Sequence, residues 1–174
     1  GISVGPGGAT HQAIEDIAIT RAIPNMVILV PADPIEVEKV VEAAARYYGP
    51  VYIRLARMPI SPIFDKSYEF SIGKAVQLLD GEDVTVFACG VMIEESLKAV
   101  ELLKHEGIST RLINVSTIKP IDKSIILKSA RETGALVTVE DHNIIGGLGS
   151  AVAEILSEEC PTPLVRVGLR DTFG

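Results

Sequence analysis

The alternation of short apolar runs with stretches of helical periodicity most constrains how this chain of 174 residues can fold. Such alternation is typical of an α/β domain with a mostly parallel sheet. After residue 72 we expect strands at Lys74–Leu78, Val84–Cys89, Thr110–Val115, Ala135–Val139 and Leu164–Val167, and helices at Glu94–His105, Asp122–Thr133 and Gly149–Glu158. The first two strands should form an antiparallel pair, because residues 79–83 are too few for a parallel crossover.

The first 60 residues contain less sheet than the rest. Strands are expected at Met26–Val30, a continuous apolar run typical of a strand buried on both faces, and at Val51–Leu55. One helix should begin at Thr10, and a second should follow the capping box of residues 33–36 and end near Tyr48. Two strands are too few for a stable sheet. We therefore expect a domain remnant over residues 1–60, a linker over 61–71 and a complete five-stranded domain over 72–174.

Charge and composition exclude several classes of protein. Sixteen Lys and Arg against 23 Asp and Glu give a net charge of −7, which argues against nucleic acid as the main partner. No apolar run approaches the ~18 residues of a membrane span, and the start resembles no signal peptide. The two cysteines, Cys89 and Cys160, suggest neither a disulfide framework nor a metal site, so we expect a cytoplasmic protein. Gly1 is not a natural start, and we expect the gene to extend upstream.

Three collinear stretches of the sequence resemble the transketolase family. Residues 8–16 (GATHQAIED), followed by 21–26 (RAIPNM), are similar to a family signature of the form D-G-P-T-H-Q-P-I-E-D, then R-x-I-P-N. The second match is STIKPID at residues 116–122. The third is VTVEDH at residues 137–142, followed by GGLG at 146–149. Together these matches cover nearly the whole chain in the family's order.

The resemblance implies an α/β fold made of a partial pyrimidine-binding domain and a three-layer α/β/α C-terminal domain. The latter should have a five-stranded, mostly parallel sheet with one antiparallel strand. Transketolases of the pentose phosphate pathway move a two-carbon ketol unit from a ketose phosphate to an aldose phosphate, using thiamine diphosphate and Mg²⁺. Some organisms split the enzyme, and this chain looks like the second, C-terminal polypeptide. The implied partners are an N-terminal subunit that holds most of the cofactor, a second copy in a homodimer or an α2β2 assembly, and sugar phosphates. The family's glutamate and stacking aromatics that bind the pyrimidine ring match no residue here.

His11 and Arg57 are the candidate site residues. We expect His11 at the N-terminus of the first helix, where the helix dipole disfavours imidazolium and keeps the ring neutral. By resemblance it matches the histidine that contacts the ketol fragment; otherwise it is a loop histidine that helps to cap the helix. Arg57 follows the carboxyl end of a strand, where ligands of α/β sheets gather, and its guanidinium suits a phosphate. By resemblance it binds the substrate's terminal phosphate; otherwise it is a solvated arginine. Arg54 is interpreted as structural.

Other motifs are interpreted as structural. Gly7 stands where many transketolases have an acidic residue that helps to select the sugar, so donor and acceptor preference stay open. The turn Gly146–Gly149 is interpreted as tight helix–sheet packing. Residues 140–142 (EDH) are interpreted as a structural or interface motif, and Cys89 as a core residue.

Three other functions stay open. The chain is also similar to 1-deoxyxylulose-5-phosphate synthase, although Ile14-Glu15-Asp16 favours transketolase. A non-catalytic assembly or regulatory subunit would keep the fold without the chemistry. A nucleotide-binding domain would use Gly146–Gly149. Association is expected on the leading interpretations, because a partial domain leaves a sheet edge and apolar surface uncovered.

Overall fold

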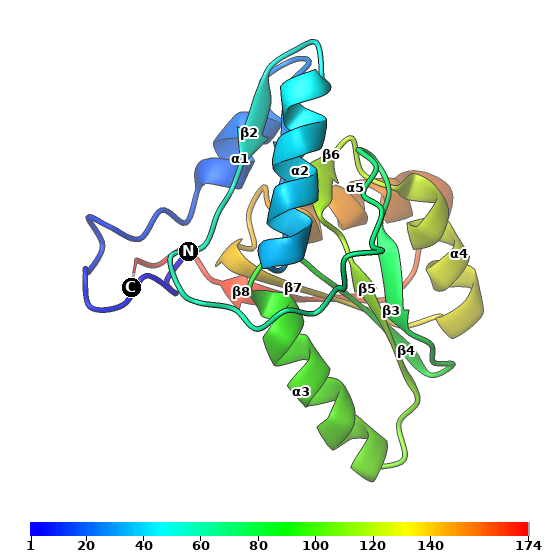
Figure 1. Ribbon diagram of the computed structural model, residues 1–174. Helices are drawn as coiled ribbons and strands as arrows, with labels where there is room; N and C mark the ends of the chain where they lie inside the picture. The colour runs from blue at the N-terminus through cyan, green and yellow to red at the C-terminus, as the bar shows by residue number, and fades with distance from the viewer. Residues whose placement is uncertain (174) are drawn as a thin grey trace.

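The computed structural model describes residues 1–173, which form two sheets that meet near the middle of the molecule (Figure 1). The smaller sheet has the order β2-β1-β6, and the larger has the order β3-β5-β4-β7-β8. The strands of the smaller sheet are β1 (Val27–Leu29), β2 (Val51–Ile53) and β6 (Thr117–Lys119). Those of the larger are β3 (Val76–Leu79), β4 (Val84–Ala88), β5 (Thr110–Asn114), β7 (Leu136–Asn143) and β8 (Leu164–Leu169).

Helices cover both faces of the larger sheet, which confirms the three-layer α/β/α architecture. Helix α3 (Met92–His105) packs on one face, where Ile93 and Val100 meet Val86 and Leu112. Helices α4 (Lys123–Thr133) and α5 (Leu148–Glu159) pack on the other, around a core that contains Phe87. Cys89 is buried in the same core, as expected, and burial raises the pKa of its thiol.

The antiparallel strand β3 is confirmed, but its expected neighbour is wrong. Strand β3 pairs antiparallel with β5, whereas β4 pairs in parallel with β5 and β7. The short connection to β4 therefore fixed the relative direction of the two strands. It did not make them neighbours, because the chain crosses β5 before it returns as β4.

Side-chain caps set the start of two helices where the sequence indicated them. In α2 (Pro34–Arg46), Asp33 accepts a hydrogen bond from the Glu36 amide at 2.7 Å, with Pro34 in the first turn. In α4, Asp122 accepts from the Ile125 amide at 3.4 Å. The Glu36 side chain turns back as in a capping box, although it accepts from the amide of Ala32 and not from that of Asp33.

Strand β6 ties the two sheets together and is absent from the sequence prediction. It lies in the STIKPID stretch and pairs antiparallel with β1, with Ile28 opposite Lys119 and Leu29 opposite Thr117. A segment that follows the larger sheet's β5 in the chain thus completes the smaller sheet. The smaller sheet is consequently built from both parts of the chain.

Residues 61–72 form a packed strap between the sheets. Phe70 and Ile72 pack against the core of β1, β2 and α2, while Ile63 and Phe64 pack against the α3 face of the larger sheet. The amides of Ile63 and Phe64 both donate to Asp33, at 2.6 and 2.8 Å. The expected linker therefore has extensive contacts with both sheets.

The predicted start of the first helix at Thr10 is wrong. Helix α1 spans Asp16–Arg21, and residues 1–15 have no regular helix or strand. The Thr10 hydroxyl lies 2.9 Å from Nδ1 of His11 and does not cap a helix. No helix within residues 1–173 is both long and apolar enough to cross a bilayer.

Candidate functional site

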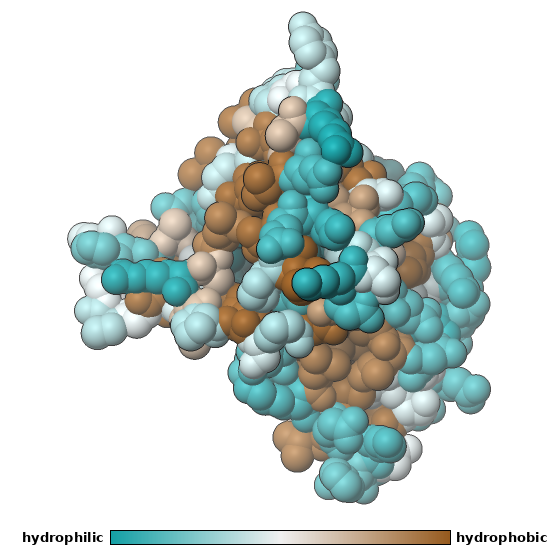
Figure 2. All heavy atoms as spheres, viewed as in Figure 1, coloured by the Kyte–Doolittle hydropathy of each residue, from teal (hydrophilic) through white to brown (hydrophobic). Residues whose placement is uncertain are grey.

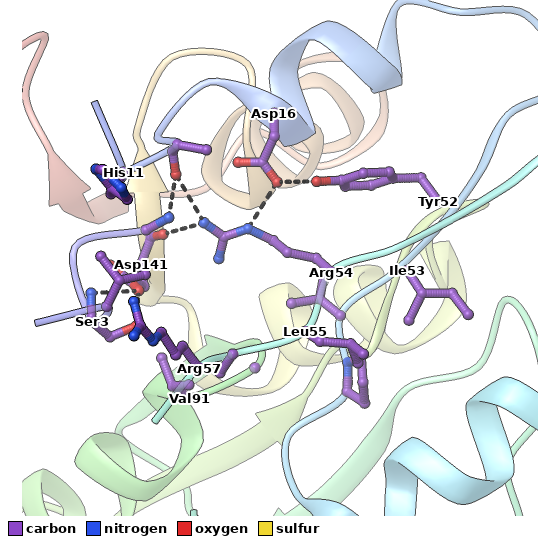
Figure 3. A pocket seen from close by; sticks show the side chains of 17 residues that line it. Ser3, His11, Asp16, Tyr52, Ile53, Arg54, Leu55, Arg57, Val91 and Asp141 are labelled. Carbon is purple, nitrogen blue, oxygen red and sulfur yellow. Dashed lines mark hydrogen bonds and ion pairs between the residues drawn. The ribbon is translucent and has the colours of Figure 1, made fainter. Parts of the chain in front are cut away.

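A cavity of about 300 Å³ lies where the carboxyl ends of strands from both sheets converge. Strand β1 leads into it at Val30 and Pro31, β2 at residues 54–57, and β4 at Gly90 and Val91. Residues of the loop before α1 form another wall, and Asp141 near the end of β7 completes it (Figure 3). Ligands of α/β sheets commonly bind at this edge.

The structure brings both predicted site residues, His11 and Arg57, to this one cavity. His11 lies on the loop and is exposed, so its predicted place at the N-terminus of the first helix is wrong. Arg57 is exposed, and none of the arginine ion pairs within residues 1–173 involves it. An imidazole and a free guanidinium thus face one polar cavity.

Gly7 lies directly against His11. A Cβ at Gly7 would lie 2.8 Å from Cβ of His11, closer than atoms of this kind approach one another. Any side chain at position 7 therefore requires this loop or the imidazole to shift. The absence of a side chain at Gly7 therefore allows His11 to occupy its present position.

Arg54, three residues before Arg57, is surrounded by a network of acceptors. Its Nε donates to Oδ2 of Asp16 at 2.9 Å, and its terminal nitrogen donates to the carbonyl oxygens of Asp141 at 2.9 Å and Ala13 at 3.3 Å (Figure 3). Both side chains of the Arg54–Asp16 pair are 14% exposed. The guanidinium connects β2, α1, the loop and β7, which agrees with the structural role predicted for it.

The electrostatics of this network keep Asp16 ionised. Burial alone would raise the pKa of Asp16, but the Arg54 guanidinium and the Tyr52 hydroxyl, which donates at 2.8 Å, lower it overall. Burial and the bond to Asp16 raise the pKa of Tyr52 to about 12. The tyrosine is therefore a neutral donor near pH 7.

The family models decide the question of identity. The model described as "Transketolase, C-terminal domain" matches residues 73–174, and the one described as "Transketolase, pyrimidine binding domain" matches residues 1–61. This chain belongs to the transketolase family.

Related transketolase sequences and one solved structure support this assignment. A putative transketolase C-terminal section of Methanocaldococcus jannaschii is 49% identical over 177 residues, which cover 100% of this chain and 55% of that protein. A 6-deoxy-6-sulfo-D-fructose transketolase subunit of a Clostridium species is 47% identical, covering 100% of this chain and 54% of its own. A solved split-gene transketolase, described as an inactive β4 tetramer, superposes with a TM-score of 0.92 at 48% identity, covering 94% of this chain and 55% of the other. The chain thus spans about half the length of these relatives.

In this transketolase-family chain, the end of β7 carries three buried residues of the predicted EDH motif. Glu140 accepts from the amides of Leu148 and Gly149 at 2.7 and 2.8 Å, yet burial raises its pKa to about 7. His142 donates from Nδ1 to the Asn143 carbonyl at 2.6 Å and accepts at Nε2 from the Ala18 amide at 3.4 Å. Burial lowers the pKa of His142, so the ring is neutral with its proton on Nδ1.

The glycine-rich turn before α5 is tightly packed, which agrees with its predicted structural role. A Cβ at Gly147 would lie 1.9 Å from Oε2 of Glu140, and one at Gly149 would lie 2.7 Å from Cδ of Arg166. The Glu140 carboxylate already occupies the amides at the start of α5. A nucleotide phosphate has no room there.

Sequence reasoning missed several residues of the cavity. Gly90 and Val91 could have been found from the rule that gave Arg57, because they directly follow the predicted strand that became β4. Tyr52 and Asp141 lie within strands, and their positions depend on how the two sheets meet. No local signal in the sequence indicates that meeting.

The lining residues of this chain do not suffice to hold thiamine diphosphate. Tyr52 has the only phenol or phenyl ring among them, its hydroxyl is bonded to Asp16, and no glutamate lines the cavity. Within residues 1–173 no group of three or more His, Cys, Asp or Glu side chains is arranged to hold a metal ion. His11 and Arg57 instead suit a hydroxyl and an anionic group, the two features of a sugar phosphate.

Proposed function

We propose that this chain is the C-terminal component of a split transketolase, which transfers a two-carbon ketol unit from a ketose phosphate to an aldose phosphate. The single observation that carries the proposal is the convergence of His11 and Arg57 on one cavity at the carboxyl edge of the sheets. Within it, residues 1–60 are the later part of the pyrimidine-binding domain, 61–71 the linker and 72–174 the C-terminal domain. Family membership and the two family-model matches support this division.

In this function His11 forms a hydrogen bond with the hydroxyl next to the reacting carbonyl. Arg57 binds the terminal phosphate, where its fork of N–H donors can engage two oxygens at once. Thiamine diphosphate supplies the carbanion chemistry when it is bound. We propose that the N-terminal subunit holds most of this cofactor together with Mg²⁺, because the residues that line the cavity here do not suffice.

Association with that subunit is part of the proposal. Large apolar side chains that include Leu55 and Met58 are more than half exposed, and both line a groove of about 390 Å³ beside the cavity. Figure 2 shows such apolar surface between polar regions on one face of the molecule. The solved relative described as an inactive β4 tetramer is consistent with a component that needs its partner. We propose a homodimer of this chain within an α2β2 complex.

Reconstitution tests the proposed function. The complete polypeptide is mixed with the candidate N-terminal subunit, thiamine diphosphate and Mg²⁺, and two-carbon transfer from xylulose 5-phosphate to ribose 5-phosphate is followed. Transfer that requires both polypeptides supports the proposal, whereas a complex that forms without transfer contradicts it. Condensation with pyruvate would identify a 1-deoxyxylulose-5-phosphate synthase instead.

Two substitutions test the assigned roles. The variant His11→Ala should reduce kcat/KM at least a hundredfold, while His105→Ala, at the end of α3, should leave it unchanged. The variant Arg57→Ala should raise KM for ribose 5-phosphate by about 10- to 100-fold without changing activity towards unphosphorylated ribose. Arg131→Ala, in the last turn of α4, is the control. An assembled complex whose transfer activity changes with neither the His11 nor the Arg57 substitution would indicate that this chain is an assembly subunit.

A further inference from the structure

The segment that carries His11 has no helix or strand of its own. Residues 1–15 lie outside regular structure. Their internal backbone bonds are short turns such as His11 to Gly8 at 3.0 Å, together with one from the Gly1 amino group to the Ala13 carbonyl. A loop of this kind is held in place mainly by its contacts with other elements. Those contacts therefore decide where His11 lies.

The outer end of β7 provides most of the hydrogen bonds among these contacts. Pairing of β7 with β4 ends at Val139, and the register with β8 shifts between Val139 and Asn143. Backbone groups beyond Val139 are thus available to other partners. The Asn143 amide donates to the Ile14 carbonyl at 2.9 Å, and the Asp141 carbonyl accepts from Arg54 at 2.9 Å.

The Asp141 side chain binds the opposite end of the same segment. Its Oδ1 accepts from the Ile2 amide at 2.8 Å, and its Oδ2 accepts from the Ser3 hydroxyl at 2.6 Å and from the Ser3 amide at 3.4 Å. The residue is 8% exposed and lines the cavity. Burial alone would raise its pKa, but these hydrogen bonds contribute to a pKa that is lowered overall, so it accepts as a carboxylate.

We propose that Asp141 is a positioning residue, whose carboxylate fixes the loop of residues 1–15 so that His11 faces the cavity. The proposal rests on the proposed function for its catalytic consequence, but its structural part can be measured without any activity. It gives residues 72–174 a part in catalysis although they contribute neither His11 nor Arg57. The residue acts through the loop and does not itself touch the reacting atoms.

The chemistry of the carboxylate explains why asparagine should replace it only in part. Both oxygens of Asp141 accept, and they share three donors. An asparagine side chain has one acceptor oxygen, so its NH₂ faces either the Ile2 amide or the Ser3 pair. The Ser3 hydroxyl can turn and accept from this NH₂, but neither backbone amide can. Loss of a charge-assisted hydrogen bond corresponds to a change of about tenfold or more in the population of the ordered loop.

The test uses the complete polypeptide in its complex with the N-terminal subunit. The variant Asp141→Asn is compared with Ser3→Ala, which removes one donor and leaves β7 intact. The matched control is Asp65→Asn, because Asp65 accepts from the amide and hydroxyl of Ser67 in the same manner, at an exposed position of the strap. Hydrogen exchange of the peptide that contains residues 2–15 is followed by mass spectrometry, together with kcat and KM.

The expected result is amide exchange in residues 2–15 that is about tenfold or more faster in Asp141→Asn, with a smaller increase in Ser3→Ala. In a complex that transfers the two-carbon unit, kcat should fall about tenfold while KM for the aldose phosphate stays within about threefold. In the double variant Asp141→Asn/Ser3→Ala, the fold-changes in exchange rate and in kcat should be smaller than the products of those in the single variants. The control should match the parent protein in every measurement.

Unchanged exchange in Asp141→Asn would overturn the proposal, and so would faster exchange with unchanged kcat in an active complex. Exchange that rises equally throughout β7 in both variants would also overturn it, because this would indicate general loosening. If the parent complex transfers no ketol unit, the proposed function fails. The exchange measurements then decide by themselves whether Asp141 holds the loop.

Discussion

Arg54 and Arg57 lie three residues apart, yet the structure predicts opposite effects when each is replaced by alanine. Arg54 donates to Asp16, Ala13 and Asp141, and its side chain is 14% exposed. Its removal leaves Asp16 as a largely buried carboxylate with only the Tyr52 hydroxyl as a side-chain donor. Breaking one partner of a fully buried pair costs about 3–5 kcal/mol, and this largely buried pair should lie near the lower end of that range. For a chain of this size, a loss of about 3 kcal/mol corresponds to a decrease in Tm of about 6–12 °C.

Arg57 should behave as an ordinary surface residue in the same measurement. It is exposed and faces the cavity without forming an ion pair, so Arg57→Ala should change stability by less than about 0.5 kcal/mol. Its effect should appear only in the binding of a phosphorylated sugar. The two variants thus separate a residue that holds the cavity together from one that faces a ligand.

Thermal and urea unfolding of the parent chain and both variants, followed by circular dichroism, provide the test. The additional variant Arg54→Lys keeps the charge but cannot reach three acceptors, so its stability should fall between those of the parent and Arg54→Ala. The double variant Arg54→Ala/Asp16→Asn should be less destabilised than the sum of its single variants. Equal stability of Arg54→Ala and the parent chain would refute the stabilising role of Arg54.

Three further predictions concern Glu140, the strap of residues 61–72 and the loop before α1. Burial raises the folded-state pKa of Glu140 from 4.5 to about 7. Between these pH values the native state binds more protons than the unfolded state. The free energy of unfolding should therefore fall by up to about 3 kcal/mol as pH rises from 4.5 to above 7. Glu140→Gln should reduce this dependence of the unfolding free energy on pH, measured by urea unfolding at several pH values. Tyr68→Phe removes the hydroxyl that donates to buried Glu36 at 2.6 Å and should cost about 1.5–3 kcal/mol, again by urea unfolding. Gly7→Asp should displace the adjacent His11. Two-carbon transfer should therefore fall with every sugar tested, and the relative preference among the sugars should not change.

The sequence predicted most of the larger sheet and its helices because their signals are local. The strand patterns gave β4, β5, β7 and β8 to within a few residues, and Asp33 caps α2 as expected. Strand β6 was missed because it has three residues and pairs with β1, some 90 positions earlier in the chain. A short strand of this kind is defined by its distant partner and not by its own periodicity.

The failed prediction of a helix from Thr10 has a specific physical cause. A helix through this segment would pair the Ala13 and Ile14 carbonyls with amides four residues later. Instead, Arg54 donates to the Ala13 carbonyl and the Asn143 amide donates to that of Ile14. The Ala18 amide, which would have bonded to Ile14, donates to His142 at 3.4 Å. Tertiary hydrogen bonds therefore replace the first helical turns.

The same contacts connect two of the motifs by which the sequence resembles its family. The stretch at residues 8–16 carries His11, and the EDH motif at 140–142 occupies the end of β7 that bonds to the loop around it. Read separately, the first motif indicates chemistry and the second indicates structure. In the folded chain Asp141 lines the cavity and bonds to the loop, while neighbouring Asn143 bonds to Ile14 and His142 to Ala18. The position of His11 thus depends on the part of β7 that extends beyond Val139, where its pairing with β4 ends. This property follows from how the two sheets meet and from neither motif alone.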